Sequence, residues 1–282
     1  MKNRIIFCCL FAAITLIAFT EKIRAQNSES LSLCTEKPLD GIYATKISER
    51  VPLAYPHLEE RDVLWEKRIW REIDVKELRN HHFAAAKRYF IDILFEGLQN
   101  KKIRAFGNEE FSNEISYEDI SKVLNTADTI EVEDPQTGIK SYVPVKNNFD
   151  PSNVTKYRIK EVVYFDSKLG RMNIRILGIA PIVNLNDNQG NPVATTALCW
   201  FYYNDLRPVL VREPMLGDNT DIRGLSWDDV FQARVFSSHI IKQSNVRDLR
   251  LQDVHSGMAI IQKGDDIRDE IRSIEADFFS EY

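Results

Sequence analysis

A series of short apolar runs between residues 128 and 211, separated by turn signals alone, constrains the fold of this chain more than any other feature. Residues 129–145 alternate between apolar and polar side chains around a predicted turn at Pro135–Gly138. Residues 156–183 do the same around Asp166–Gly170. Because no segment long enough for a helix lies between these strands, they predict an antiparallel meander rather than a parallel nucleotide-binding sheet.

The same region predicts two more strands. The polar turn cluster NLNDNQGNP, residues 184–192, precedes the run VATTALCWFYY at 193–203. Its apolar stretch from Ala197 to Tyr203 is unbroken, which is typical of a central strand covered on both faces. We expect residues 207–211, RPVLV, to form the last strand.

Helical periodicity precedes the strands. In residues 59–73 an apolar residue recurs at every fourth position, which predicts an amphipathic helix. A second helix is expected at 83–98. A third helix is expected after Ser116, because Asp119 at the N3 position can reach back to this N-cap residue. The apolar stripe of the first helix is formed by Trp65, Ile69 and Ile73, with Val63 and Trp70 beside it.

Helical periodicity also follows the strands. Ser226 and Asp229 form a predicted capping box before a helix at 227–244. Residues 265–282 carry apolar side chains at three- and four-residue steps, which predicts a final helix. The expected fold class is therefore α+β, with N-terminal helices, a central antiparallel β-meander and C-terminal helices.

The first 25 residues have the layout of a secretory signal peptide. Lys2 and Arg4 precede an uncharged apolar run, Ile5–Phe19, and cleavage is expected after Ala25. The apolar run is shorter than the ~20 residues that a membrane-spanning helix needs. No cysteine stands where a lipoprotein would be acylated, so we expect an exported chain without a lipid anchor of its own.

The remaining chain is expected to contain an extended, proline-bearing segment, 26–56, and a single α+β domain, 57–282. No second hydrophobic stretch of bilayer length follows, so we expect no membrane span. Removal of residues 1–25 leaves 33 Lys and Arg against 41 Asp and Glu. This acidic balance argues against nucleic acid as a partner, because affinity for nucleic acid depends on neutralising phosphates.

Two cysteines, Cys34 and Cys199, remain after the predicted cleavage. Export permits a disulfide between them, but two cysteines form no disulfide framework. One lies in the N-terminal segment and the other in a predicted strand, so their redox state stays open at this point.

The search for catalytic and metal-binding patterns is negative. None of the five histidines has a partner at zinc-ligand spacing. The cluster at 184–192 starts like a calcium loop, but Gln189 replaces the required glycine and Thr195 the required acid. The stretch GLSWDD starts like a nucleophile elbow, but Asp228 replaces its second glycine. We therefore predict no catalytic residue, no cofactor and no metal.

The tryptophan-bearing stretch at 59–74 contains six acids against four bases. A base-stacking platform needs a basic groove beside its aromatic residues, so this stretch does not predict nucleic-acid binding. Trp70 lies at the edge of the apolar stripe and is interpreted either as core or as an interface anchor. In the second case Lys67, Arg68 and Arg71 would form its polar rim.

Four long strings carry a resemblance that covers the chain from about Asp40 onward. The sequence resembles the GldN/PorN family of gliding-motility and type IX secretion proteins of the Bacteroidetes. The strings are YPHLEERDVLWEKRIWREIDVKE, DSKLGRMNIRILGIAP, CWFYYNDLRPVLVRE and LSWDDVFQARVFSSHIIKQSNV.

The resemblance implies a non-enzymatic periplasmic subunit. Family members form a large ring with a partner lipoprotein, GldK or PorK, at the inner face of the outer membrane. The ring works with the inner-membrane GldL and GldM motor pair to support secretion and, in gliding species, movement. For this chain we expect ring contacts from Trp70 with Arg68 and Arg71, and from the predicted helix around Trp227 and Phe231.

Two other classes of function stay open. An exported hydrolase would use the neighbourhood of Asp228, Asp229 and His239, but on one helix the first and last of these lie about 16 Å apart along the axis. A free periplasmic protein could instead bind a small ligand along the strand from Trp200 to Tyr203.

Overall fold

Three long antiparallel strands form the centre of the fold: β1 (Val63–Asp74), β6 (Val154–Asp166) and β7 (Arg171–Asn186). Their β-branched and aromatic residues suit a pleated, buried surface. Residues Ile47–Tyr282 form one compact unit. The computed structural model describes residues 46–85, 87–124, 128–133, 140–145, 150–186, 192–215 and 224–281.

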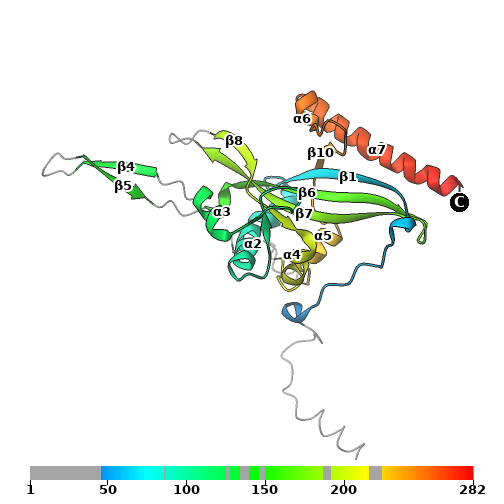
Figure 1. The fold of residues 1–282 in the computed structure, drawn as a ribbon, viewed down its shortest axis with the longest axis horizontal. Helices are drawn as coiled ribbons and strands as arrows, with labels where there is room; N and C mark the ends of the chain where they lie inside the picture. The colour runs from blue at the N-terminus through cyan, green and yellow to red at the C-terminus, as the bar shows by residue number, and fades with distance from the viewer. Residues whose placement is uncertain are drawn as a thin grey trace, which may run out of the picture. The chain divides into compact units, whose positions relative to one another are not determined.

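These strands belong to an eight-stranded sheet in the order β10-β1-β6-β7-β9-β2-β3, with β8 also paired to β7 (Figure 1). All strand pairs in the described residues are antiparallel, so the predicted antiparallel sheet and the α+β class are confirmed. A separate sheet contains β4 and β5 alone. The remaining strands are β2 (Ala105–Phe106), β3 (Glu114–Ile115), β4 (Asp128–Glu133), β5 (Lys140–Val145), β8 (Pro192–Ala197), β9 (Trp200–Tyr202) and β10 (His239–Gln243).

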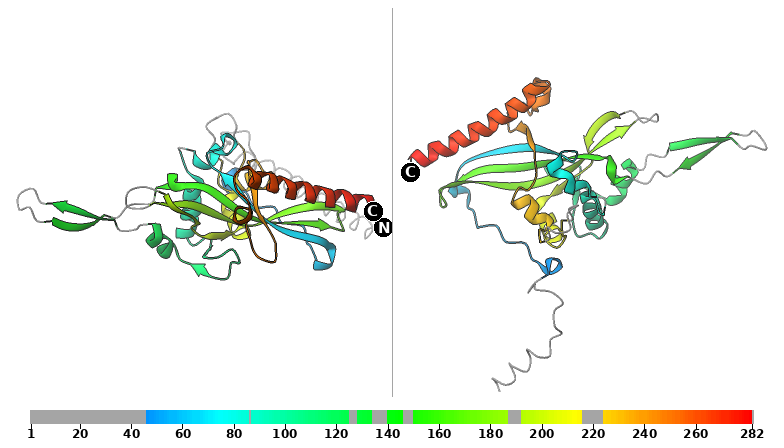
Figure 2. Two further views of the ribbon diagram at one scale, coloured as in Figure 1. Left: turned by 90° about the horizontal axis from the view of Figure 1, so that it is seen from above. Right: turned by 180° about the vertical axis from the view of Figure 1, so that it is seen from behind.

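Helices pack on both sides of the eight-stranded sheet. In Figures 1 and 2, α7 lies on one side, and α2, α4 and α5 lie on the other. The α-helices are α2 (Phe90–Gln99), α3 (Tyr117–Leu124), α4 (Tyr203–Leu210), α5 (Trp227–Gln232), α6 (Leu251–Val254) and α7 (Met258–Glu281). The 3-10 helices are η1 (Ile47–Glu49), η2 (Glu60–Asp62), η3 (Leu78–Ala84) and η4 (Pro151–Asn153).

The predicted helix at 59–73 is wrong: these residues form η2 and most of β1. A spacing of four residues is also a multiple of two, so Trp65, Ile69 and Ile73 share one face of a strand as readily as one face of a helix. Pairing decided the outcome, because β1 bonds to β6 on one edge and to β10 on the other. The segment predicted as the first N-terminal helix therefore forms a central strand of the sheet.

The second predicted helix starts later than expected. Residues 78–84 form η3, and α2 begins at Phe90. The backbone N–H of Tyr89 donates to the Asp92 carboxylate at 3.1 Å, which caps the new start. The third predicted helix is confirmed as α3, and Ser116 caps it by accepting a bond from the Asp119 N–H at 3.2 Å.

The last predicted strand, 207–211, is also wrong, because these residues belong to α4 and its C-terminal end. Tyr203, Leu206 and Leu210 lie at three- and four-residue steps, and all three are fully buried. Burial of this helical face therefore decides the structure of the segment, although its valines favour a strand. The expected single strand at 193–203 is divided into β8 and β9, which pair with different parts of β7.

The predicted helix at 227–244 is confirmed only in its first turns. The capping box is present: the Ser226 N–H donates to the Asp229 carboxylate at 2.9 Å, and the Asp229 N–H donates to the Ser226 hydroxyl at 3.2 Å. The helix ends at Gln232, and Arg234 has a left-handed backbone with φ of 54°. The chain then forms β10 along the edge of β1.

The main core lies between the sheet and helices α2, α4 and α5. A smaller apolar cluster joins β1, β6 and β10 to Ile267 of α7. Gly264 lets α7 approach the sheet closely, since a Cβ there would lie 2.9 Å from the Ile240 carbonyl oxygen. The final predicted helix is confirmed as part of α7, and Phe278 stacks on Phe165 at 4.3 Å between ring centroids.

Some sequence predictions fall outside the described residues. These are the signal peptide at 1–25, residues 26–45 of the segment 26–56, Cys34, and the turn centres within 134–139 and 187–191. Cys199 is described and is a buried free thiol, and burial raises its pKa.

Candidate interaction surface

Trp70, the first predicted anchor, is buried within β1. Its side chain is 5% exposed and packs with Phe106 and Trp200. The ammonium nitrogens of Lys242 and Lys160 lie 4.2 and 5.5 Å from its ring centroid. Cation–π contacts contribute about 0.5–2 kcal/mol, with larger values for desolvated cations. Trp70 is therefore held inside the subunit by apolar packing and by two lysines.

A short loop between β2 and β3 closes over these lysines. Lys160 donates to the Glu109 carbonyl oxygen at 2.8 Å, and Lys242 donates to the Glu109 carboxylate at 3.2 Å. Burial lowers the pKa of Lys160, although the charge of Glu109 opposes the shift. Phe111 of the same loop packs so closely on Gly178 that a Cβ there would lie 2.5 Å from its ring. The loop thus shields Trp70 from contact with other molecules.

The two predicted rim arginines have different surroundings. Arg68 is exposed, whereas Arg71 is mostly buried and donates to the Ser238 hydroxyl at 3.1 Å. Arg71 also pairs at 3.6 Å with Glu161, which is fully buried and accepts from Arg234 at 2.8 Å. Arg68 alone is therefore placed as a rim residue.

Trp227 and Phe231 lie in the main core rather than on the surface. Their exposed fractions are 2% and 0%. Trp227 packs against Phe90 at 4.4 Å and Phe83 at 5.1 Å between ring centroids, and Phe231 completes the cluster. The contact role of the five predicted residues stays a prediction, but substitution of these two would first disturb folding.

The acids of the hydrolase hypothesis serve structural contacts. Asp228 is 5% exposed and accepts from the Tyr203 hydroxyl at 2.8 Å and from Arg207 at 3.2 Å. Asp229 caps α5 and pairs with Arg50 at 2.7 Å. Hydrogen bonds and the charge of Arg50 lower the pKa of Asp229, and they outweigh its burial.

His239 does not share a helix with Asp228, because it begins β10. The expected separation of about 16 Å along a common helix axis is therefore the wrong geometry. The imidazole lies 4.0 Å from Glu72. Burial lowers the pKa of His239, although the charge of Glu72 opposes the shift. The three residues of the hydrolase hypothesis thus have separate structural partners.

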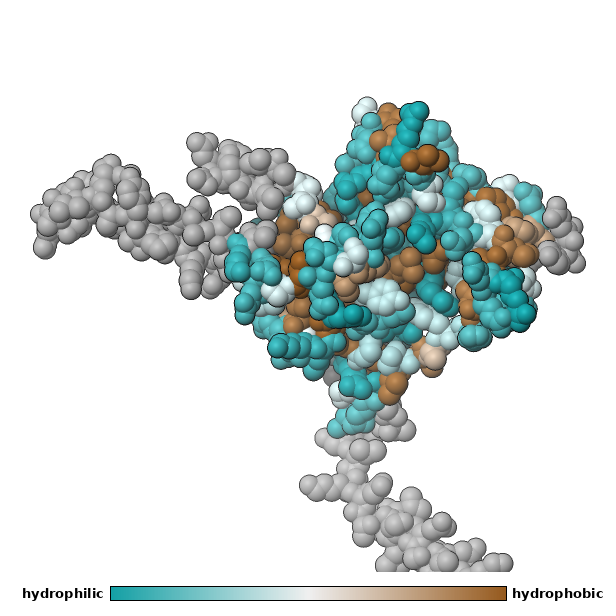
Figure 3. All heavy atoms as spheres, viewed as in Figure 1, coloured by the Kyte–Doolittle hydropathy of each residue, from teal (hydrophilic) through white to brown (hydrophobic). Residues whose placement is uncertain are grey.

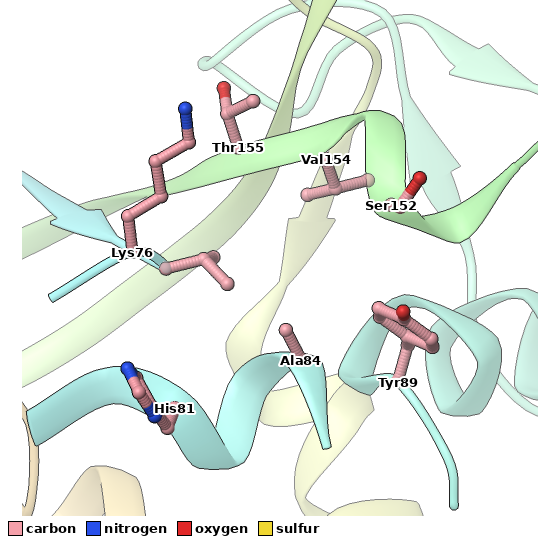
Figure 4. A pocket seen from close by; sticks show the side chains of 8 residues that line it. Lys76, His81, Ala84, Tyr89, Ser152, Val154 and Thr155 are labelled. Atoms are coloured by element: carbon pink, nitrogen blue, oxygen red, sulfur yellow. The ribbon is translucent and has the colours of Figure 1, made fainter. Parts of the chain in front are cut away.

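A pocket of about 360 Å³ opens beside the end of β1 (Figure 4). His81 and Tyr89 line it from one side, and Lys76, Ser152 and Thr155 line it from the other. The strand expected to bind a small ligand, from Trp200 to Tyr203, does not line this pocket. Within the described ranges no three His, Cys, Asp or Glu side chains gather as metal ligands. No helix in the described part of the chain is long and apolar enough to span a membrane.

Two exposed apolar surfaces were missed by the sequence reasoning. The first, here called the strap, is the extended segment 50–57. Val51 and Leu53 on it are 73% and 84% exposed. Pro52 and Pro56 lack the N–H that strand pairing requires, and the backbone of 51–57 makes no hydrogen bond to the described residues. The alternation of proline with apolar residues is the sequence feature that could have indicated this exposed segment.

Side-chain contacts hold the strap against α4, α5 and β7. The Tyr55 ring lies between the guanidinium groups of Arg207 and Arg175, at 4.3 and 4.5 Å from its centroid. The Tyr55 hydroxyl accepts from Gln232 at 2.8 Å, and burial raises its pKa. Together with the pair between Arg50 and Asp229, these contacts fix both ends of the exposed Val51–Leu53 segment.

The second exposed surface, here called the α6 patch, follows β10. Its apolar side chains stand exposed among polar atoms over α6 and the first turns of α7 (Figure 3). Exposed apolar patches of this kind mark interaction sites more often than isolated apolar residues do. Apolar residues that interrupt a polar stretch are the sequence feature that could have indicated this patch. The patch comprises Val246, Leu249, Val254, Met258 and Ile261.

A groove of about 290 Å³, here called the α6 groove, runs through this patch. Leu249, Leu251 and Val254 contribute apolar walls. Arg247 and Arg250 stand at the groove, exposed and without an ion pair to any described residue. The groove therefore combines apolar walls with two exposed cations that make no ion pair with a described residue.

The fold and these surfaces define an α+β protein that buries its ion pairs in the sheet and exposes apolar segments for contact. Residues 58–280 match the family model described as gliding motility associated protein GldN. The chain belongs to the GldN family, as the resemblance predicts, and this membership supports a role related to gliding motility and type IX secretion. Among curated proteins, no match is found.

Proposed function

We propose that this chain is a non-enzymatic structural subunit of the type IX secretion system. It forms a periplasmic ring with a GldK/PorK-like lipoprotein at the inner face of the outer membrane, and the ring works with a GldL/GldM-like motor. This assembly supports protein secretion and, where the cell glides, movement.

The observation that carries the proposal is the family match over residues 58–280, nearly the whole described chain. Two further observations support it. The groups of the hydrolase hypothesis have structural partners, since Asp228 binds Arg207 and Asp229 binds Arg50. The strap and the α6 patch are exposed apolar surfaces suited to protein contact.

The test is the size and composition of the native assembly. Envelope extract from cells carrying a tagged, otherwise intact chain is separated by gel filtration, and the lipoprotein is followed by mass spectrometry. We expect the chain in a very large assembly that contains the lipoprotein, and in much smaller species when the lipoprotein gene is deleted. Loss of secretion should accompany deletion of either gene.

A chain that elutes as a free monomer or dimer from native envelope would contradict the proposal. Turnover of a metabolite by the isolated subunit would contradict its non-enzymatic part. In that case the polar pocket lined by Lys76 and His81 becomes the first place to search for substrate.

A further inference from the structure

We propose that the strap of one copy docks in the α6 groove of a second copy, so that subunits join head to tail. The inserted residues are Val51 and Leu53, and the receiving walls are those of Leu249, Leu251 and Val254. This inference deepens the proposed function and rests on it, because a ring needs contacts that join successive subunits, and a contact between copies of this chain supplies one.

The two surfaces match in shape and polarity. Val51 and Leu53 project from an extended segment that the described residues leave without apolar cover, and they are 73% and 84% exposed. The α6 groove, at about 290 Å³, has room for aliphatic side chains. Insertion would remove apolar surface of both partners from water, which is the main driving force of association.

The strap is already held in a docking conformation. Arg50 is fixed to Asp229 at 2.7 Å, and Tyr55 is fixed between Arg175 and Arg207. The residues between these anchors therefore lose less conformational freedom on binding than a free peptide would.

Polar groups at the two surfaces are complementary as well. Glu49, two residues before Val51, is exposed and makes no ion pair to the described residues. Arg247 and Arg250 at the groove are likewise unpaired within the described residues and would neutralise this acid.

The placement of the surfaces decides the symmetry. The strap is bound to α4 and α5, and α6 lies beyond the opposite side of the sheet with α7 (Figures 1 and 2). One chain therefore cannot insert its own strap, and the contact joins two different patches. Such a heterologous contact builds a closed ring or an open filament rather than a two-fold dimer.

The sharpest test is a mixed-chain disulfide. A Leu53→Cys chain is mixed with a Val254→Cys chain, both lacking the signal segment and carrying Cys34→Ser, and oxidised mildly. We expect a covalent heterodimer at several times the yield obtained when Leu78→Cys replaces Leu53→Cys. Leu78 is the matched control because it is 83% exposed, close to Leu53, and lies outside the strap. Equal yields would overturn the proposal.

Sedimentation velocity gives the energetic test. Leu53→Ser and Val254→Ser should each weaken self-association about tenfold or more, as expected when a central anchor is truncated. The double variant should be little worse than either single variant, because both remove one contact. Leu78→Ser should behave as the unmodified chain. Self-association unchanged by both variants, or absent in the unmodified chain, would overturn the proposal.

The envelope experiment separates this inference from the function on which it rests. If the Leu53→Ser chain keeps the lipoprotein but elutes in small complexes, the head-to-tail contact is supported. If it loses the lipoprotein while self-association persists, the strap binds the lipoprotein, and the inference fails although the proposed function stands. If the unmodified chain joins no large envelope assembly, the proposed function itself fails.

Discussion

Trp70 and Trp227 are both buried, but the two regions around them achieve burial by different means. Trp227 is enclosed by other aromatic rings, including Phe83 and Phe90, on α5 at the centre of the main core. Trp70 is covered by lysine side chains and by the loop that they bind. Aromatic packing is insensitive to charge, whereas a lysine cover depends on acids that remain partly in water. The first region should therefore dominate stability, and the second should be the easier one to open.

The largest effect is expected for Trp227→Ala. Removing a fully enclosed indole loses its apolar burial and leaves a cavity, a combination that costs about 3–5 kcal/mol. Urea unfolding followed by circular dichroism measures the change. Trp227→Phe should retain most of the stability, because the neighbouring rings can still pack on it. A cost below about 1 kcal/mol for Trp227→Ala would contradict the difference between the two regions.

The second effect concerns the polar edge of the same aromatic region. In Asp228→Asn the buried Arg207 loses its counter-charge, and a cost of about 2–3 kcal/mol is expected. Thermal unfolding at pH 7 measures it. The neighbouring Asp229→Asn is the matched control: its partner Arg50 is about two-fifths exposed, so the lost pair should cost less than about 1 kcal/mol. Equal losses of stability in the two variants would show that burial of an ion pair does not determine how much its removal costs.

The third prediction tests the lysine cover of Trp70. In Lys242→Met the cation–π contact and the pairs with Glu109 and Asp248 disappear, but both acids can hydrate. A stability loss of about 1–2 kcal/mol is expected. Hydrogen exchange at residues 107–112 should rise, because Lys242 binds that loop through Glu109.

Lys263→Met is the control for this variant. Its pair with Asp266 is exposed and joins neighbours on one helix, so exchange in the loop and stability should stay nearly unchanged. Equal exchange in the loop of both variants would contradict the idea that Lys242 holds it closed.

The same contrast explains what could be predicted from the sequence. The fold class followed from strands without intervening helices, and the capping box of Ser226 followed from local chemistry that the structure keeps. The spacing of four residues in the stretch around Trp70 predicts a helix, but it fits the period of a strand as well, and only pairing with distant strands decides between them. Long-range pairing is not encoded in a short window.

The candidate surfaces were harder to predict than the fold. Trp227 belongs to a predicted helix for which we expect ring contacts, but the tertiary packing of Phe83 and Phe90 encloses its side chain. The strap and the α6 patch carry ordinary aliphatic residues. Their significance lies in exposure, as for Leu53 and Val246, which depends on what the rest of the chain leaves uncovered.

The smallest predicted effect is an acid sensitivity inside the aromatic region. His82 lies 5.6 Å from Trp227 between ring centroids, and its buried Nε2 has no partner among the described residues. Burial, with a contribution from the charge of His81, lowers its pKa from 6.5 to about 4. The unfolded chain therefore binds a proton between these values while the folded chain does not, so stability falls as the pH drops from 6.5 toward 4.

Because the His82 ring is partly exposed, solvent screens much of this shift, and a loss of about 1 kcal/mol between pH 7 and 4 is expected from this residue. The measurement is the difference in melting temperature between the unmodified chain and His82→Phe across that range. The variant should lose less on acidification, since phenylalanine keeps the ring contacts without a titrating group. His81→Gln removes only the smaller contribution to the lowered pKa of His82, the charge of His81, so it should change the acid sensitivity less than His82→Phe does. If the melting temperatures of the unmodified chain and of His82→Phe fell in parallel with pH, the prediction would be wrong. The aromatic region would then be insensitive to charge throughout, and acid would act first on the lysine-covered region around Trp70.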